Sequence, residues 1–176
     1  MTAVYLYAPD SDGYDTLAQA SAQSDRALAT LESAEPVASK WRPIKVVADK
    51  HGGSGDFPSF LPHVPAFSRR ALDVLQPLLG DAIEALPLDF GRLEFFAIHV
   101  LEVVDCLDEN LSVIKRFPSG GVMSIRKHVF DEKCVGERLM FRIREAPLWG
   151  VYYTDRFKQL LETAKLEGLK DRKVFP

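Results

Sequence analysis

Three carboxylates, Asp105, Asp108 and Glu109, follow closely on an apolar run that ends at Val104. Converging carboxylates could bind a divalent cation or act as a general acid and base, which would make the chain a small hydrolase or transferase. However, the segment contains no glycine-centred calcium loop, and no second acidic pair with suitable spacing accompanies it. The same residue types dominate turns, so we interpret Asp105 and Asp108 as side chains that bond turn backbone after a buried strand.

The cysteines and two of the histidines form no clear catalytic pattern. Cys106 stands beside Asp105 and could be a nucleophile with His99 or His128 as its base, but a cysteine after a valine run is more typical of a small buried hydrophobe. Cys106 and Cys134 lie outside any CxxC pattern, and we expect two reduced thiols in a cytosolic protein. We expect His99 to be a core histidine and His128, among charged neighbours, to be exposed.

Motifs for metals and phosphates are missing from the sequence as well. The histidines lack zinc-type spacing; they are His51, His63, His99 and His128. The glycine-rich stretch HGGSGDFP lacks the Lys-[Ser/Thr] of a phosphate-binding loop, and no Gly-x-Ser-x-Gly sequence is present. We therefore expect no catalytic residue, no metal and no cofactor, and a protein that is not an enzyme.

The composition is that of a globular domain. The chain has 176 residues, 47% of them hydrophobic and 27% charged, which predicts one domain over residues 1–176 with a real core. The net charge is −3 and we find no basic stripe, so a nucleic-acid partner is not expected. No apolar run approaches the roughly 20 residues that span a bilayer, and the start of the chain lacks a basic leader. We expect a cytoplasmic protein with no membrane partner.

Residue periodicity predicts an α+β fold, in which a central, largely antiparallel sheet carries a few flanking helices. Helices are expected at 14–36, from Ser68 to Gly80, and from Thr154 or Asp155 to Gly168. Strands are expected at 3–7, 44–48, 83–90, 93–104, 111–117, 122–130, 138–145 and 172–175, and a helical turn capped by Asp131 follows the sixth of them. The Gly/Pro-rich segment 49–68 is expected to be a long loop, and loops of that length are often functional.

Both tryptophans, Trp41 and Trp149, stand beside turn residues, in KWRP and LWGV. Aromatic residues at such positions can anchor a protein partner. They can equally act as lids on the core, because tryptophan is highly buried on average.

Several short signatures occur in an order that resembles a known family. They are W-x-P at Trp41 and Pro43, GDFP at 55–58, FSRRA at 67–71, E-x-LPL at 84–88, VVDCLD at 103–108 with Ser112, VYYTDRF at 151–157 and GL at 168–169. Together they resemble immunity family eleven of bacterial polymorphic toxin systems, over about residues 4–175. The Ala-rich stretch 17–31 departs from that pattern.

The resemblance implies an antidote that acts inside the cell and binds a toxin encoded beside it. Such proteins block the toxic domain sterically, and the toxins paired with this family are varied, many of them predicted nucleases. Acidic groups can enter the basic cleft of a nuclease, so Asp105, Asp108 and Glu109 are candidate toxin contacts. Trp41 and Trp149 are candidate toxin contacts as aromatic anchors. The alternatives are the hydrolase or transferase using Asp105 and Asp108, and a non-catalytic subunit of a larger complex.

Overall fold

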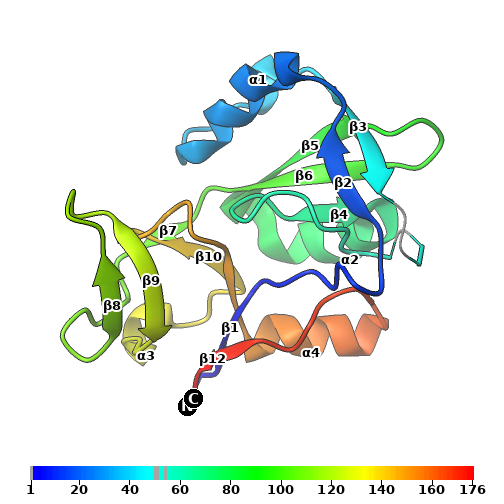
Figure 1. Cartoon of the computed structure of the whole chain (residues 1–176). Coiled ribbons are helices and arrows are strands. Elements are labelled where there is room, and N and C mark those ends of the chain that lie inside the picture. The colour runs from blue at the N-terminus through cyan, green and yellow to red at the C-terminus, as the bar shows by residue number, and fades with distance from the viewer. Residues whose placement is uncertain (1, 50–51, 54) are drawn as a thin grey trace.

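The computed structural model describes residues 2–49, 52–53 and 55–176. One five-stranded sheet brings the two ends of the chain together. Its strand order is β12 (Lys173–Phe175), β1 (Val4–Leu6), β11 (Tyr152–Thr154), β10 (Met140–Ile143) and β7 (Val103–Val104). The neighbours are antiparallel except β10 and β7, which are parallel. Because β1 pairs with β12, the N- and C-termini lie side by side (Figure 1).

A second five-stranded sheet is formed by the middle of the chain and the N-terminal strand β2 (Thr16–Gln19). Its order is β2, β3 (Ile44–Asp49), β5 (Ile83–Asp89), β6 (Phe95–Val100) and β4 (Ala66–Ser68). Only β3 and β5 pair in parallel. All six residues of β6 are buried, as expected for a strand covered on both faces. The predicted α+β class is confirmed, but the strands form several sheets instead of one central antiparallel sheet.

A third, two-stranded sheet is the hairpin of β8 (Val113–Arg116) and β9 (Val122–Lys127). It pairs with neither larger sheet and lies at the left of Figure 1, where Ile125 packs into the core cluster that it shares with the first sheet. The chain leaves it through α3 (Glu132–Val135), whose first turn is capped by Asp131 as predicted: its Oδ1 accepts from the backbone N–H groups of Lys133 and Cys134.

The helix α2 (Arg69–Leu79) matches its predicted bounds closely. It contains Pro77 and continues past it to Leu79. Ser68 caps it by accepting from the N–H of Ala71, and Gly80 ends it with a positive φ. The helix buries Ala71, Leu72, Leu75 and Leu79, whereas Leu78, although apolar, is 52% exposed.

The C-terminal helix α4 (Asp155–Ala164) buries Phe157 and Leu161, which lie four residues apart on one face. It ends at Lys165, which takes the left-handed conformation at φ 52°, so the prediction that Gly168 stops the helix is wrong. Gly168 instead lies at φ 116° against the backbone of Phe57, where a side chain would be strained.

The predicted helix at 14–36 is the largest error in the expected elements. The structure has β2, then η1 (Ala22–Ser24), α1 (Asp25–Ala29) and η2 (Thr30–Glu32) in this region. Leu17 is buried and Ala18 exposed, a strand alternation enforced by pairing with β3. Two further 3₁₀ turns are η3 (Ala38–Lys40) and η4 (Gly80–Ala82). Tertiary pairing has thus overridden the helical preference of an Ala-rich segment.

The core consists of three clusters of buried side chains. The first joins α2 and α4 to strands of both larger sheets, the second packs beneath the β8–β9 hairpin, and the third joins the second large sheet to the N-terminal helical segment. Among the residues described, no helix is long and apolar enough to cross a membrane.

Candidate functional site

Asp108 is held inside the turn that leads from β7 to β8. Its Oδ1 accepts hydrogen bonds from the backbone N–H groups of Asn110 (2.9 Å) and Leu111 (3.1 Å). Its carbonyl oxygen accepts from the N–H of Ser112 (2.9 Å). Asp108 therefore bonds turn backbone, as the sequence interpretation had it.

The two neighbouring carboxylates have different partners. Asp105 is exposed, and its Oδ2 accepts from Arg144 Nη1 at 3.1 Å, while Glu109 Oε2 accepts from Arg116 Nη2 at 2.6 Å. The interpretation of Asp105 as a turn-bonding residue is therefore wrong. Burial, reinforced by the hydrogen bond and charge of Asp105, raises the pKa of the nearby Glu145 carboxyl. Within the described parts of the chain, no three His, Cys, Asp or Glu side chains are grouped to hold a metal ion.

Cys106 and Cys134 form a disulfide, which contradicts the expectation of two reduced thiols. Their Cα atoms lie 5.4 Å apart across 28 residues of chain. The Cys106 carbonyl also accepts from the N–H of Asp131 (2.9 Å), so folding of the β8–β9 segment back on itself brings the cysteines together. The sequence gives no local signal for this contact. Cys106 is buried, as predicted for a small hydrophobe.

His99 lies in a buried polar chain, as expected for a core histidine. Its Nδ1 lies 3.1 Å from Glu84 Oε2 and its Nε2 lies 2.8 Å from the Ser33 carbonyl oxygen. Glu84 also accepts from the backbone N–H groups of Val37 and Ala38. Burial of Glu84 opposes ionisation, but these donors outweigh it and lower the pKa of its carboxyl.

Arg142 was not predicted from the sequence, and its side chain is fully buried in β10. Its guanidinium donates to the carbonyl oxygens of Leu31 (3.4 Å), Glu32 (3.3 Å) and Ser33 (2.8 Å). Burial lowers the pKa of Arg142, and burial and then the Arg142 charge lower the pKa of His63. Arg142 thus ties the first large sheet to the N-terminal helical segment. An arginine inside the apolar run LMFRI is the sequence signal that could have found it.

The prediction of an exposed His128 is wrong. The residue is buried, and its ring stacks on Phe130 and bonds the Tyr152 hydroxyl through Nε2 (3.1 Å). Burial, followed by the positive charge of Arg172, lowers the pKa of His128 to about 4. The imidazole is therefore neutral at pH 7. His51, which the sequence analysis grouped with it, lies outside the described residues.

Both tryptophans are half-buried. Trp41 donates its indole N–H to the Pro87 carbonyl oxygen (2.9 Å) and lines a groove of about 460 Å³ together with Ala27 and Ile44. Trp149 packs against the second core cluster. Each side chain thus covers core while keeping part of its surface open to a partner.

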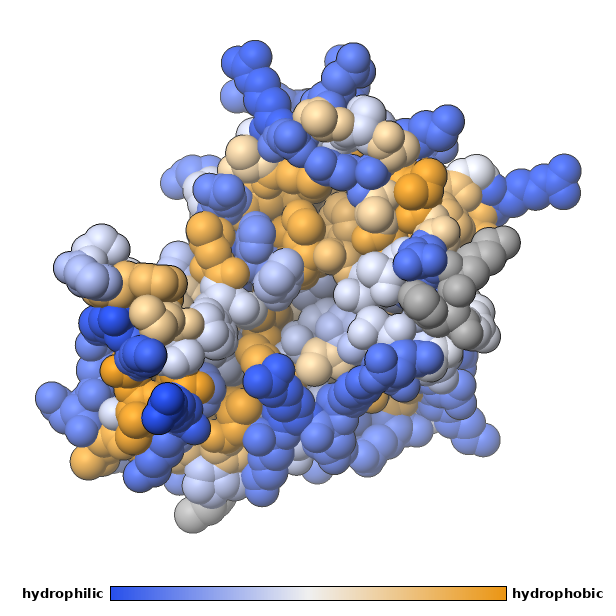
Figure 2. All heavy atoms as spheres, viewed as in Figure 1, coloured by the Kyte–Doolittle hydropathy of each residue, from blue (hydrophilic) through white to orange (hydrophobic). Residues whose placement is uncertain are grey.

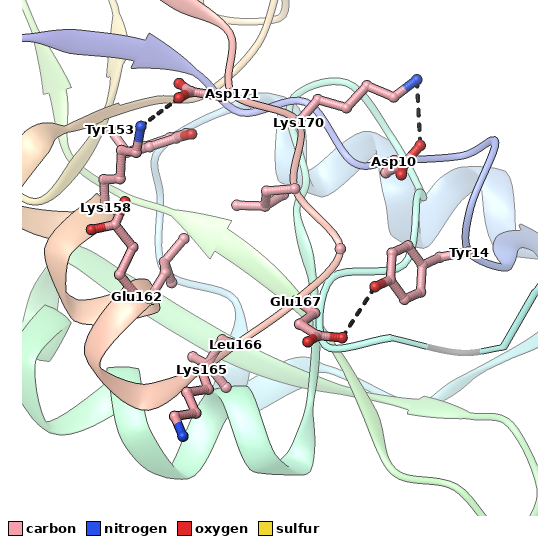
Figure 3. Close-up of a pocket in the computed structure, with 13 residues that line it drawn as sticks. Asp10, Tyr14, Tyr153, Lys158, Glu162, Lys165, Leu166, Glu167, Lys170 and Asp171 are labelled. Atoms are coloured by element: carbon pink, nitrogen blue, oxygen red, sulfur yellow. Dashed lines mark hydrogen bonds and ion pairs between the residues drawn. The ribbon is translucent and has the colours of Figure 1, made fainter.

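A charged hollow of about 400 Å³ lies between α4 and the chain that follows it (Figure 3). The ion pairs and hydrogen bonds around it are Lys158 with Asp171, Lys170 with Asp10, and Tyr14 with Glu167. These contacts connect the segment 165–172, which precedes β12, to α4 and to the loop after β1. Lys158 has a raised pKa, primarily because Asp171 accepts its hydrogen bond. We assign the hollow to the packing of this segment.

In this α+β protein, the candidate carboxylates and the described histidines each have their own structural partners and do not converge on one site. Residues 66–175 match the model of the Imm11 immunity protein family. Because the match covers more than half of the chain, the protein belongs to this family, as its resemblance predicted. No curated protein matches the chain.

The family match begins at β4 and reaches the last strand. It includes the acidic turn, the disulfide, the β8–β9 hairpin and Trp149. Trp41 and the GDFP signature lie before it, so they are features of this chain outside the matched segment.

Proposed function

We propose that this protein is the immunity partner of a toxin encoded beside its gene, and that it neutralises the toxic domain by binding it sterically. Membership of the Imm11 family carries the proposal. The toxin class that we propose to test first is a nuclease, and the place of action is the cytoplasm of the cell that makes both proteins.

Capture without catalysis is supported by how the candidate acid groups are used. Asp108 is occupied by turn backbone, whereas Asp105 and Glu109 are paired with arginines on the surface. A mechanism that uses Asp105 and Asp108 as acid and base requires both carboxyl groups to face one reacting centre. The raised pKa of Glu145 arises mainly from burial. We propose that the residues 1–176 act as one binding domain.

The test is co-expression of the chain with the toxic domain encoded next to its gene, with growth scored and the tagged chain recovered. Rescue with a stable complex supports capture. Rescue without a complex would instead favour an enzyme that reverses the toxin's effect and would return Asp105 to the catalytic candidates. Growth arrest with no complex would overturn the proposal for that toxin. Nuclease activity of the purified toxic domain, measured with and without an equimolar amount of the chain, tests the toxin class.

A further inference from the structure

We infer that the β8–β9 hairpin, residues 111–127, is the surface on which the toxic domain docks, and that the toxin presents an acidic, partly apolar surface there. The inference rests on the proposed function and adds to it a location and a partner chemistry. It differs from the sequence expectation, in which acidic residues of this chain enter a basic cleft.

Exposed apolar side chains gather on the hairpin. Leu111 is 60%, Val113 49% and Phe117 48% exposed, and these are three of the eight large hydrophobic side chains exposed on the described surface. Single exposed apolar residues are ordinary, but three within seven positions of chain are a concentration typical of an interaction site. Figure 2 shows hydrophobic and strongly hydrophilic atoms interspersed over this part of the molecule.

The charge of the hairpin has the opposite sign to that of the whole chain. Residues 111–127 contain four basic and no acidic side chains, in a protein of net charge −3. Arg116 is paired with Glu109 and also donates to the Gly120 carbonyl. Lys115, Arg126 and Lys127 are exposed, and no ion pair engages them within the described chain. Three uncompensated cations beside apolar groups complement an acidic partner surface.

The backbone of the hairpin adds a further contact. β8 and β9 form a sheet of two strands only, so β8 has an open edge to which a partner strand can add. Lysine on an edge strand also discourages pairing with a wrong chain, which explains Lys115. That explanation does not extend to the exposed Val113 on β8 or to Leu111 and Phe117 on either side of it, whose presence beside an open edge favours a specific partner.

The base of the hairpin is fixed before any partner binds. The Cys106–Cys134 disulfide closes it, and Ser112 accepts from the N–H of Val129 (3.0 Å) across it. Asp108 holds the turn that enters β8. A preorganised contact surface loses less conformational entropy on binding, which is what tight capture requires. In this arrangement, Asp108 positions the hairpin.

The inferred docking surface on the toxin is acidic, so it is not the nucleic-acid cleft of a nuclease. If the toxin is a nuclease, the hairpin contacts a surface beside the cleft, and the bulk of the immunity protein blocks access to it. Docking on the hairpin is therefore distinguishable from docking on the acidic residues, since contact through Asp105 and Glu109 would require a basic toxin surface.

The experiment measures binding of the full chain to the catalytically inactivated toxic domain encoded beside the gene, at low and high salt. The hairpin variant is Lys115→Glu with Arg126→Glu and Lys127→Glu. The matched control makes the same charge change on other exposed elements: Arg26→Glu, Arg92→Glu and Lys165→Glu. We expect the hairpin variant to lose at least about 30-fold in affinity and most of the salt dependence, and the control to change by less than about 3-fold.

A second pair of variants tests the apolar part. Phe117→Ser is expected to weaken binding about 10-fold or more, as truncation of an aromatic anchor does, while Leu93→Ser, at an equally exposed site on the β5–β6 turn, leaves binding unchanged. Circular dichroism will show whether the triple hairpin variant is folded. If it is not, the two single surface substitutions still test the inference.

The outcomes separate the two proposals. Wild-type binding that both hairpin variants retain would overturn the docking inference and leave the immunity function standing. Absence of a wild-type complex would remove the immunity function for that toxin and the inference with it. Hairpin-dependent binding of a nucleic-acid probe, with toxin binding unaffected, would also overturn the inference.

Discussion

Reduction of the Cys106–Cys134 disulfide offers a quantitative test of the structure that needs no substitution. The bond closes a loop across 28 residues, and that loop contains the whole β8–β9 hairpin. Breaking the bond releases the unfolded chain from the loop constraint, so the reduced protein should be less stable.

The loop length sets the size of the effect. Chain-entropy arithmetic for 28 residues gives about 3.6 kcal/mol of stabilisation at 25 °C. With a urea slope of about 2 kcal/mol per M, typical of a domain of this size, reduction should lower the urea midpoint by about 1.8 M. The folded structure should persist after reduction, because the backbone bond from Asp131 to Cys106 and the bridge between Leu107 and Phe130 hold the same base.

The assay compares urea unfolding of the protein with and without dithiothreitol, with thiols titrated in the unfolded chain. We expect no titratable thiol before reduction and two after it. The variant with Cys106→Ala and Cys134→Ala is the control, and reductant should leave its midpoint unchanged. Two free thiols in the untreated protein, or equal midpoints before and after verified reduction, would refute the reasoning. A smaller shift would instead measure structure that persists in the unfolded loop.

Three other changes address buried and turn-forming polar groups. Arg142→Met should lower the unfolding free energy, measured by urea titration, by about 2–4 kcal/mol, because carbonyl oxygens of the N-terminal segment lose their donor. Its control, Arg144→Met, removes only a surface ion pair and should cost less than about 1 kcal/mol in the same titration. The pKa of His128 is about 4 in the fold and 6.5 in the reference state, so the unfolded chain binds the extra proton, and stability should fall by up to about 3 kcal/mol as pH drops from 6.5 to 4. His128→Gln should flatten that profile, and an unchanged slope would contradict the assignment. Asp108→Ala should lower the unfolding free energy by about 1–2 kcal/mol through the lost turn hydrogen bonds, whereas Asp105→Ala should change it by less than about 0.5 kcal/mol. Equal losses of stability in thermal melts would count against the different roles given to these two residues.

Elements decided by local signals could be predicted from the sequence. The cap at Ser68, the stop at Gly80 and the cap at Asp131 each act within a few residues, and the structure has them where they were expected. The strand expected at 93–104 likewise contains β6, whose apolar density is that of a strand buried on both faces. The error at 14–36 has a non-local cause: β2 exists because it pairs with β3, about thirty residues later.

The candidate site depended even more on non-local contacts. Residue type alone favoured the turn role of Asp108, but Asp105 shares that type and pairs with Arg144, 39 positions away. Burial of His128 depends on Tyr152, which approaches only when β11 joins the sheet. The exposed outer face of the β8–β9 hairpin could not be predicted either, since an alternating strand has the same sequence pattern whether or not another layer covers its outer face.

The place of β1 in the first sheet bears on what an Imm11 domain needs in order to fold. The matched segment 66–175 contains β11 and β12 but not β1, the strand that lies between them. It also contains Arg142 but not the carbonyl groups at 31–33 that this arginine binds. A fragment cut to the matched boundaries would therefore have a gap in the middle of a sheet and a buried cation without acceptors. Any relative that lacks a counterpart of residues 1–65 must close that gap differently, by direct pairing of β11 with β12 or by a strand borrowed from another chain.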